Sequence, residues 1–215
     1  MSLKRLLGTT TAALAWSALV VQLGMNVIKG ASAEAGPVVG VGMELVNYFG
    51  YFTILTNLLV ALVLTVPAVA PGGAAARRFA DLRTTWTAAA GIIVVGVAYH
   101  LLLSKIYNPT GIEAVTDLAF HYLVPALYAV YWIAFTDVRE ARWTRHVGAL
   151  SLYPTAYFAY LVVRGQLIGT YPYFFVDVRT LGLLGAFRNA MGILVCYLAV
   201  AWLIALAARR RGATA

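Results

Sequence analysis

Six long apolar runs, separated by short polar segments, dominate the 215-residue chain. They lie near 6–29, 47–70, 83–104, 116–136, 147–166 and 185–208. Each run is close to the length of about 20 residues that a transmembrane helix needs. The pattern therefore predicts an all-α polytopic membrane protein, in which residues 1–215 form one domain, a single bundle of six transmembrane helices.

Composition supports lipid as the main solvent of this chain. Hydrophobic residues make up 62% of the sequence and charged residues 11%, whereas soluble domains carry about 25% charged residues. The net charge of +8 could suggest a nucleic-acid partner, but the basic residues form short clusters between the apolar runs. Such clusters are typical of membrane orientation, so we expect no nucleic acid as a partner.

The basic residues also predict the orientation of the bundle. If the N-terminus is inside the cell, eleven of the 16 Lys and Arg residues fall on the inner side. The positive-inside rule then places both termini in the cytoplasm. We expect a multi-pass protein of the inner (plasma) membrane of the cell.

The first apolar run allows a second interpretation. Lys4 and Arg5 precede it, and Ala31-Ser32-Ala33 follows it like the cleavage site of a signal peptide. However, the apolar segment is longer than the 7–15 residues usual for signal peptides. We therefore expect this run to remain as a transmembrane helix.

Three connections lie on the predicted outer side, at 30–46, 105–115 and 165–184. The last is the longest and contains Tyr171-Pro172-Tyr173-Phe174-Phe175. Aromatic residues prefer the headgroup zone of a membrane, so this loop is predicted to anchor the protein there. The alternative is a lid over a cavity that faces the lipid.

A small set of polar residues shares one predicted layer below the outer surface. Thr53, His100 and His121 lie at similar depths in three of the runs. Asn57 follows Thr53 by four residues and Asp117 precedes His121 by four, so each pair shares a helix face. Pro125 has no N–H for the carbonyl of His121 and should disturb the helix beside the imidazole. Ionisable residues inside a membrane are costly, and function is the default hypothesis for them.

These residue types match acyl-ester hydrolysis. A Thr53 hydroxyl becomes a nucleophile when a base such as His121 takes its proton. Asp117 could hold the imidazole in place, and Asn57 or a backbone N–H could stabilise the oxyanion. Arg164, at the outer end of the fifth run, could bind a substrate carboxylate or act as an interfacial anchor. We expect no metal site and no cofactor.

The same segments resemble a known family. The resemblance is to a family of small bacterial membrane proteins that is distantly similar to the eukaryotic androgen-induced (FAR-17a-like) membrane hydrolases. Those enzymes cleave fatty acid esters of hydroxy fatty acids with an intramembrane Thr and a His. The resemblance implies that Thr53 is the nucleophile, that His121 is the base, and that the partner is a lipid or fatty acid ester. It is carried by residues 51–59, 117–125, 153–154, 164–165 and 171–175.

Other functions fit parts of the pattern. His100 and His121 lie on successive helices in one layer, and two imidazoles can hold a haem between helices of a bundle. A haem-binding or redox bundle is therefore an alternative, and so is a small transporter or lipid-binding protein. Purely structural roles are also open to these residues. An intramembrane Thr usually forms a hydrogen bond to the backbone of its own helix, and an Asn such as Asn57 often joins two helices.

Overall fold

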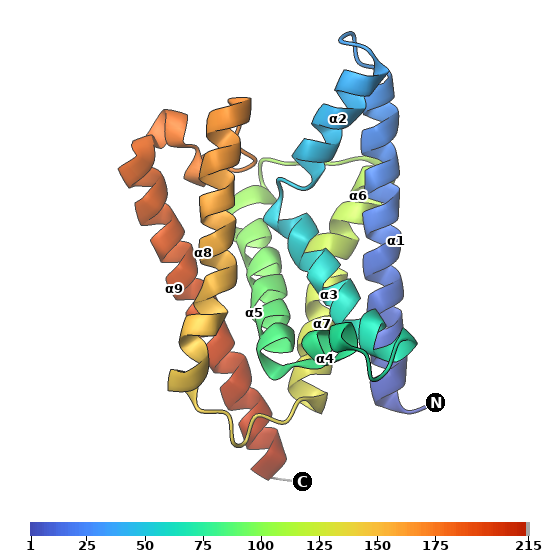
Figure 1. Ribbon diagram of the computed structural model, residues 1–215, viewed down its shortest axis with the longest axis vertical. Coiled ribbons are helices and arrows are strands. Elements are labelled where there is room, and N and C mark those ends of the chain that lie inside the picture. Colours follow the sequence, from blue (N-terminus) through green and yellow to red (C-terminus); the bar gives the residue numbers. More distant parts are fainter. Residues whose placement is uncertain (214–215) are drawn as a thin grey trace.

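The computed structural model describes residues 1–213, which are helical apart from short connections (Figure 1). Within these residues, six helical stretches are long and apolar enough to cross a membrane: Leu3–Ala31, Phe52–Val69, Leu82–Leu103, Gly111–Phe135, Trp143–Ile168 and Val178–Arg211. Each stretch overlaps one of the predicted apolar runs. The predicted fold class, an all-α polytopic bundle, is confirmed.

The start of the second run differs from the prediction. Residues 30–46 were expected to be a connection, but α2 (Pro37–Tyr48) packs back along the end of α1 (Leu3–Ala31). Pro37 occupies the first turn of α2, where its missing N–H costs nothing. The two helices touch closely at Gly30 and Gly40, where a side chain on either residue would meet the backbone of the other helix.

A break separates α2 from α3 (Phe52–Val69). Phe49 keeps helical backbone angles, Gly50 follows, and Tyr51 is extended with φ −85° and ψ 129°. The predicted helix from 47 to 70 is therefore two helices that meet at residues 49–51. This break places Thr53 in the first turn of α3 rather than in the body of a long helix.

Two transmembrane stretches contain π-helical turns. After α4 (Ala74–Ala80), α5 (Leu82–Ala98) continues into the π-helical segment η1 (Tyr99–Leu103). The next stretch consists of α6 (Gly111–Leu118), the π-helical η2 (Ala119–Leu123) and α7 (Val124–Phe135). Single π turns in α-helices are often found at functional sites.

The last two long helices close the bundle. α8 (Trp143–Ile168) is followed by a connection with the short 3₁₀ helix η3 (Phe174–Val176), and α9 (Val178–Ala213) is interrupted at Gly182. The start of α1 and the end of α9 lie at the same end of the bundle (Figure 1). We call the opposite end, which holds α2, the start of α6 and residues 169–177, the distal end; residues 169–177 are the distal loop.

α5 is the central helix. It contacts α3, α7, α8 and α9, and Ala88, Ala89 and Ala90 are fully buried on it. Small side chains allow helices to approach closely in membranes. Trp86, also fully buried, donates a hydrogen bond of 2.9 Å from Nε1 to the carbonyl oxygen of Ala201 in α9.

The buried Trp86 gives a test of this packing. Trp86→Phe removes the bond to Ala201 and leaves space that the packed neighbours cannot fill, so we expect a loss of about 2 kcal/mol in unfolding free energy. Trp202→Phe is the matched control, because the Trp202 side chain is 50% exposed. Unfolding in mixed micelles measures both. Equal stability of the two variants would contradict the central place of α5.

Candidate active site

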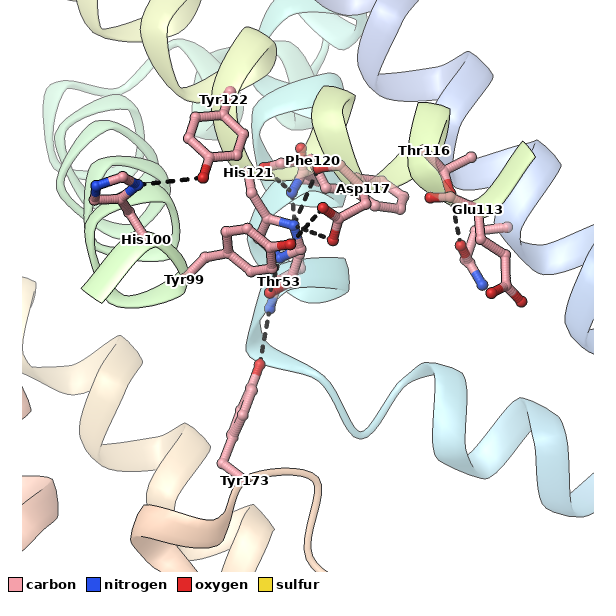
Figure 2. Close-up of polar contacts among 12 residues, drawn as sticks. Thr53, Tyr99, His100, Glu113, Thr116, Asp117, Phe120, His121, Tyr122 and Tyr173 are labelled. Carbon is pink, nitrogen blue, oxygen red and sulfur yellow. Dashed lines mark hydrogen bonds and ion pairs between the residues drawn. The ribbon is translucent and has the colours of Figure 1, made fainter. Parts of the chain in front are cut away.

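Thr53 and His121 meet near the distal end of the bundle. Thr53 is the second residue of α3, and His121 is the middle residue of η2. The Oγ1 atom of Thr53 lies 3.4 Å from Nε2 of His121 (Figure 2). Hydrogen bonds between catalytic groups are often long before substrate binds. The structure thus brings together two residues that lie on separate helices and far apart in the sequence.

Asp117 determines which nitrogen of His121 carries the proton. Nδ1 of His121 lies 3.0 Å from the carboxylate Oδ1 of Asp117 and 3.1 Å from its backbone oxygen. Both oxygens can only accept hydrogen bonds, so in the neutral ring the proton is on Nδ1. The lone pair of Nε2 then faces the Thr53 hydroxyl. Both the Asp117 and the His121 side chains are only 12% exposed.

Tyr99 completes this chain of hydrogen bonds. Its hydroxyl donates to Oδ2 of Asp117 at 2.6 Å, and its ring stacks on the His121 ring at a centroid distance of 3.8 Å and an interplanar angle of 12°. In Figure 2 the Tyr99 ring overlaps the His121 ring, on which it is stacked. The sequence analysis missed Tyr99, although it immediately precedes the candidate His100. Tyr99 restrains both the acid and the imidazole.

The π turn η2 lies where Pro125 was predicted to disturb the helix. η2 ends two residues before Pro125, and Gly96 of α5 packs against this turn. A Cβ on Gly96 would lie 2.9 Å from the carbonyl oxygen of His121 and 3.3 Å from Cβ of Pro125. The absence of a side chain at Gly96 therefore lets α5 approach the backbone of His121 closely.

Asn57 joins α3 to η2. Its Nδ2 donates to the carbonyl oxygen of Thr53 at 2.9 Å and to that of Phe120 at 3.4 Å. Because both amide hydrogens have carbonyl partners, Asn57 holds Thr53 beside His121 and is not placed as an oxyanion donor. Its Oδ1 is buried without a hydrogen-bond partner among the described residues.

His100 does not join the other predicted residues. It is exposed, and its Nδ1 lies 3.3 Å from the hydroxyl of Tyr122. In Figure 2 the His100 ring lies on the far side of Tyr99 from Asp117. The two ring nitrogens of His121 face Thr53 and Asp117. His100 and His121 are therefore not arranged to hold a haem between them.

Arg164 is buried, with 5% of its surface exposed. Its guanidinium donates to the carbonyl oxygen of Thr170 at 2.9 Å and to Oδ1 of Asn47 at 2.7 Å. These contacts tie α8 to the end of α2 and to the distal loop. Arg164 also lines a polar cavity at the distal end, so a role in binding a substrate carboxylate stays a prediction.

The distal loop reaches the nucleophile through Tyr173. The backbone N–H of Thr53 points to the Tyr173 hydroxyl at 3.5 Å, and the Tyr173 ring stacks on Phe175 at 5.2 Å. Burial raises the pKa of the Tyr173 phenol, so it keeps its proton and can donate a hydrogen bond. The loop was predicted as an anchor or a lid. In the structure Tyr173 of the loop contacts Thr53, and Pro172, Tyr173 and Phe174 line a cavity together with His121.

Two cavities meet at Thr53. An apolar cavity of about 140 Å³ lies between α3, α5, α8, α9 and the distal loop. A larger cavity of about 390 Å³ lies on the other side, toward α1, α2 and α6. Its wall combines aromatic and aliphatic side chains with polar or charged ones, because of which we call it the polar cavity; besides Thr53 these are Gln22, Asn26, Glu113, Asp117 and His121. Among the described residues, four line both cavities: Thr53, Tyr99, Leu103 and Tyr173. His121 and Asp117 line the polar cavity but not the apolar one.

The geometry supports one type of chemistry. A hydroxyl, an imidazole with its free lone pair toward that hydroxyl, and a carboxylate on the other ring nitrogen form the arrangement of a nucleophile, a base and an orienting acid. Comparison of the chain with protein-family models, curated proteins and solved structures gives no match. The geometry of the site is therefore the main indication of what the protein does.

Gly96 provides a test of the site's packing. An Ala in a helix normally stabilises it by about 1 kcal/mol relative to Gly. At Gly96 the new methyl group would press on the His121 carbonyl, so we expect Gly96→Ala to destabilise the protein by about 1–3 kcal/mol. Gly192→Ala is the control, since no described atom outside its own helix approaches that position within 4 Å. Thermal unfolding in detergent measures both; stabilisation at both sites would contradict the close approach.

Proposed function

We propose that the protein is an intramembrane hydrolase of lipid carboxylic esters, with Thr53 as nucleophile and His121 as general base. The observation that supports this most is the position of the His121 Nε2 lone pair, 3.4 Å from the Thr53 hydroxyl oxygen. The bacterial family that the chain resembles is distantly similar to the androgen-induced membrane hydrolases, and this favours a fatty acid ester of a hydroxy fatty acid as the substrate type. Asn57 supports the site structurally, and Arg164, in the wall of the distal cavity, is the candidate for binding a substrate carboxylate.

The proposed reaction has two halves. In the first, Oγ1 of Thr53 attacks the ester carbonyl carbon while His121 Nε2 takes the hydroxyl proton. The bond to the alcohol oxygen then breaks, and His121 gives its proton to that oxygen. In the second, water attacks the acyl–Thr53 ester, its proton goes to His121, and the acid leaves as the proton returns to Thr53.

Two hydrogen-bond donors lie close to the proposed nucleophile. The backbone N–H of Thr53, in the first turn of α3, lacks a helical partner and donates to the Tyr173 hydroxyl at 3.5 Å. In the proposed reaction the oxyanion takes the place of that hydroxyl as acceptor for the N–H, and the Tyr173 phenol donates its own proton to the oxyanion. Donors aimed at the oxyanion can contribute about 3 kcal/mol each to a transition state.

The distribution of basic residues along the chain and the position of the site in the bundle are consistent with this proposal. The basic clusters predict that the end with both termini faces the cytoplasm, which places the distal end and the site toward the outer leaflet. In the proposed orientation, Thr53 lies at the start of α3 below the helix α2, on the side of the bundle that faces the outer leaflet. A lipid ester of the outer leaflet would then reach the site from the membrane.

Covalent labelling with a fluorophosphonate probe tests the nucleophile. We expect the wild-type protein in nanodiscs to be labelled on Thr53, Thr53→Ala and His121→Ala to lose the label, and Thr53→Ser to keep it because it retains a hydroxyl. Thr65→Ala is the matched control, as Thr65 lies on the same helix α3, lines neither cavity, and donates its hydroxyl proton to the carbonyl oxygen of Ala61. Peptide mapping by mass spectrometry locates the adduct. An adduct on another residue, or none in folded protein, would overturn the assignment.

A second prediction concerns Tyr99 as a positioning residue. Tyr99→Phe keeps the ring that stacks on His121 but removes the hydrogen bond to Asp117, which is worth about 1.5–3 kcal/mol when one partner is charged. We expect the labelling rate of Thr53 to fall about tenfold or more, with little change in probe binding. Tyr122→Phe, which loses a contact to His100, serves as control. If both variants label at the wild-type rate, Tyr99 has no part in orienting the base.

A further inference from the structure

We infer that the site binds its ester in one direction, with a short acyl chain in the apolar cavity and a polar alcohol in the polar cavity. This inference rests on the proposed hydrolase function and changes its substrate type, from a fatty acid ester of a hydroxy fatty acid to an ester of a short acid with a polar alcohol. It follows from where Thr53 and His121 stand relative to the two cavities.

The position of His121 determines the side of the leaving group. The imidazole must protonate the alcohol oxygen as the ester bond breaks, so that oxygen has to lie on the His121 side of Thr53. His121 and Asp117 line the polar cavity, and Thr53 stands at its junction with the apolar cavity. The alcohol therefore occupies the polar cavity, and the acyl chain extends from Thr53 in the opposite direction.

The apolar cavity has the character of an acyl site. Its wall beyond Thr53 consists largely of aromatic and aliphatic side chains, among them Phe158, Phe187, Ala190 and Met191. Its volume is about 140 Å³, and an engineered protein cavity of about 150 Å³ is known to hold benzene. The space therefore suits a chain of about six carbon atoms, and a C16 chain would extend beyond it past the exposed Phe187.

The polar cavity has the character of an exit to water. Gln22, Asn26 and Glu113 line it, and the same three residues line a third cavity of about 450 Å³ at the distal end. That third cavity also has Lys29 and Arg164 in its wall. A polar alcohol can leave by this route, and the water for the second half-reaction can arrive at the side of Thr53 that faces His121.

The chain-length profile of ester hydrolysis tests this inference. With p-nitrophenyl esters of C2 to C16 acids and protein in nanodiscs, we expect kcat/KM to be highest near C6 and at least tenfold lower at C16. Ala190→Phe, which fills the apolar cavity, should move the optimum to C2–C4. Ala199→Phe is the control, because Ala199 lies on the same helix with its side chain exposed. Met191→Ala should move the optimum to longer chains.

Alcohol selectivity tests the other half of the inference. Among hexanoate esters, we expect those of glycerol to be cleaved at least tenfold faster than the ester of hexadecanol. A profile that ignores chain length, or an Ala190→Phe variant that behaves like Ala199→Phe, would overturn the acyl assignment. Faster cleavage of the hexadecanol ester than of the glycerol ester would overturn the proposed direction of binding.

A binding measurement separates this inference from the hydrolase proposal. Hexanoate is the expected acid product and should raise the melting temperature of wild-type and Thr53→Ala protein but not of Ala190→Phe. If Thr53 takes no label and no ester is cleaved, the hydrolase proposal fails, while hexanoate binding still reports on the cavity. If Thr53 is labelled but hexanoate stabilises Ala190→Phe as much as wild type, the assignment of the apolar cavity as the acyl site is wrong. The assignment of Thr53 as the nucleophile is then unaffected.

Discussion

The hydrogen bond between Asp117 and Nδ1 of His121 decides the chemistry that the site can perform. It fixes the proton on Nδ1, so that Nε2 presents a lone pair to the Thr53 hydroxyl. If the ring turned over, a protonated nitrogen would face Thr53 and could not act as a base. Tyr99 restrains both partners, through its bond to Asp117 and its stack on His121. Asn57 then holds α3 against η2.

The site is built where the helices depart from regular geometry. The break at residues 49–51 starts α3 just before Thr53, and the π turns η1 and η2 carry Tyr99 and His121. In lipid, backbone groups that leave a regular helix need partners within the protein. Such departures are costly in a membrane, and here three of them converge on one cluster of polar side chains.

The fold could be predicted from the sequence because one physical signal decides it. Long apolar runs must form helices in lipid, and all six appear as helical stretches in the described part of the chain. The prediction failed at 30–46 and at the start of the second helix, because a helix that packs on α1 and a backbone break at Gly50 depend on tertiary contacts. The spacing of apolar residues along the chain carries no information on such tertiary contacts.

The site was predictable only in part, for similar reasons. Thr53, Asp117 and His121 stand out because polar groups are rare in apolar runs, and helix spacing pairs Asp117 with His121. Tyr99 and Tyr173 carry no such signal, since aromatic residues are common in membrane helices and at their interfaces. His100 stood out in the sequence for the same reason as His121, as an ionisable residue in an apolar run. In the structure its exposed position beside Tyr122 separates it from Thr53, Asp117 and His121. Depth along a helix does not tell which way a side chain points.

Trapping of the acyl–enzyme would show whether Thr53 is the nucleophile. Wild-type protein in nanodiscs is mixed with p-nitrophenyl hexanoate, quenched in acid within the first turnover and digested for mass spectrometry. We expect a hexanoyl group on Thr53, which accumulates and then decays as hexanoate is released. Release of hexanoate by folded protein without any adduct on Thr53, or with the adduct on another side chain, would contradict this assignment.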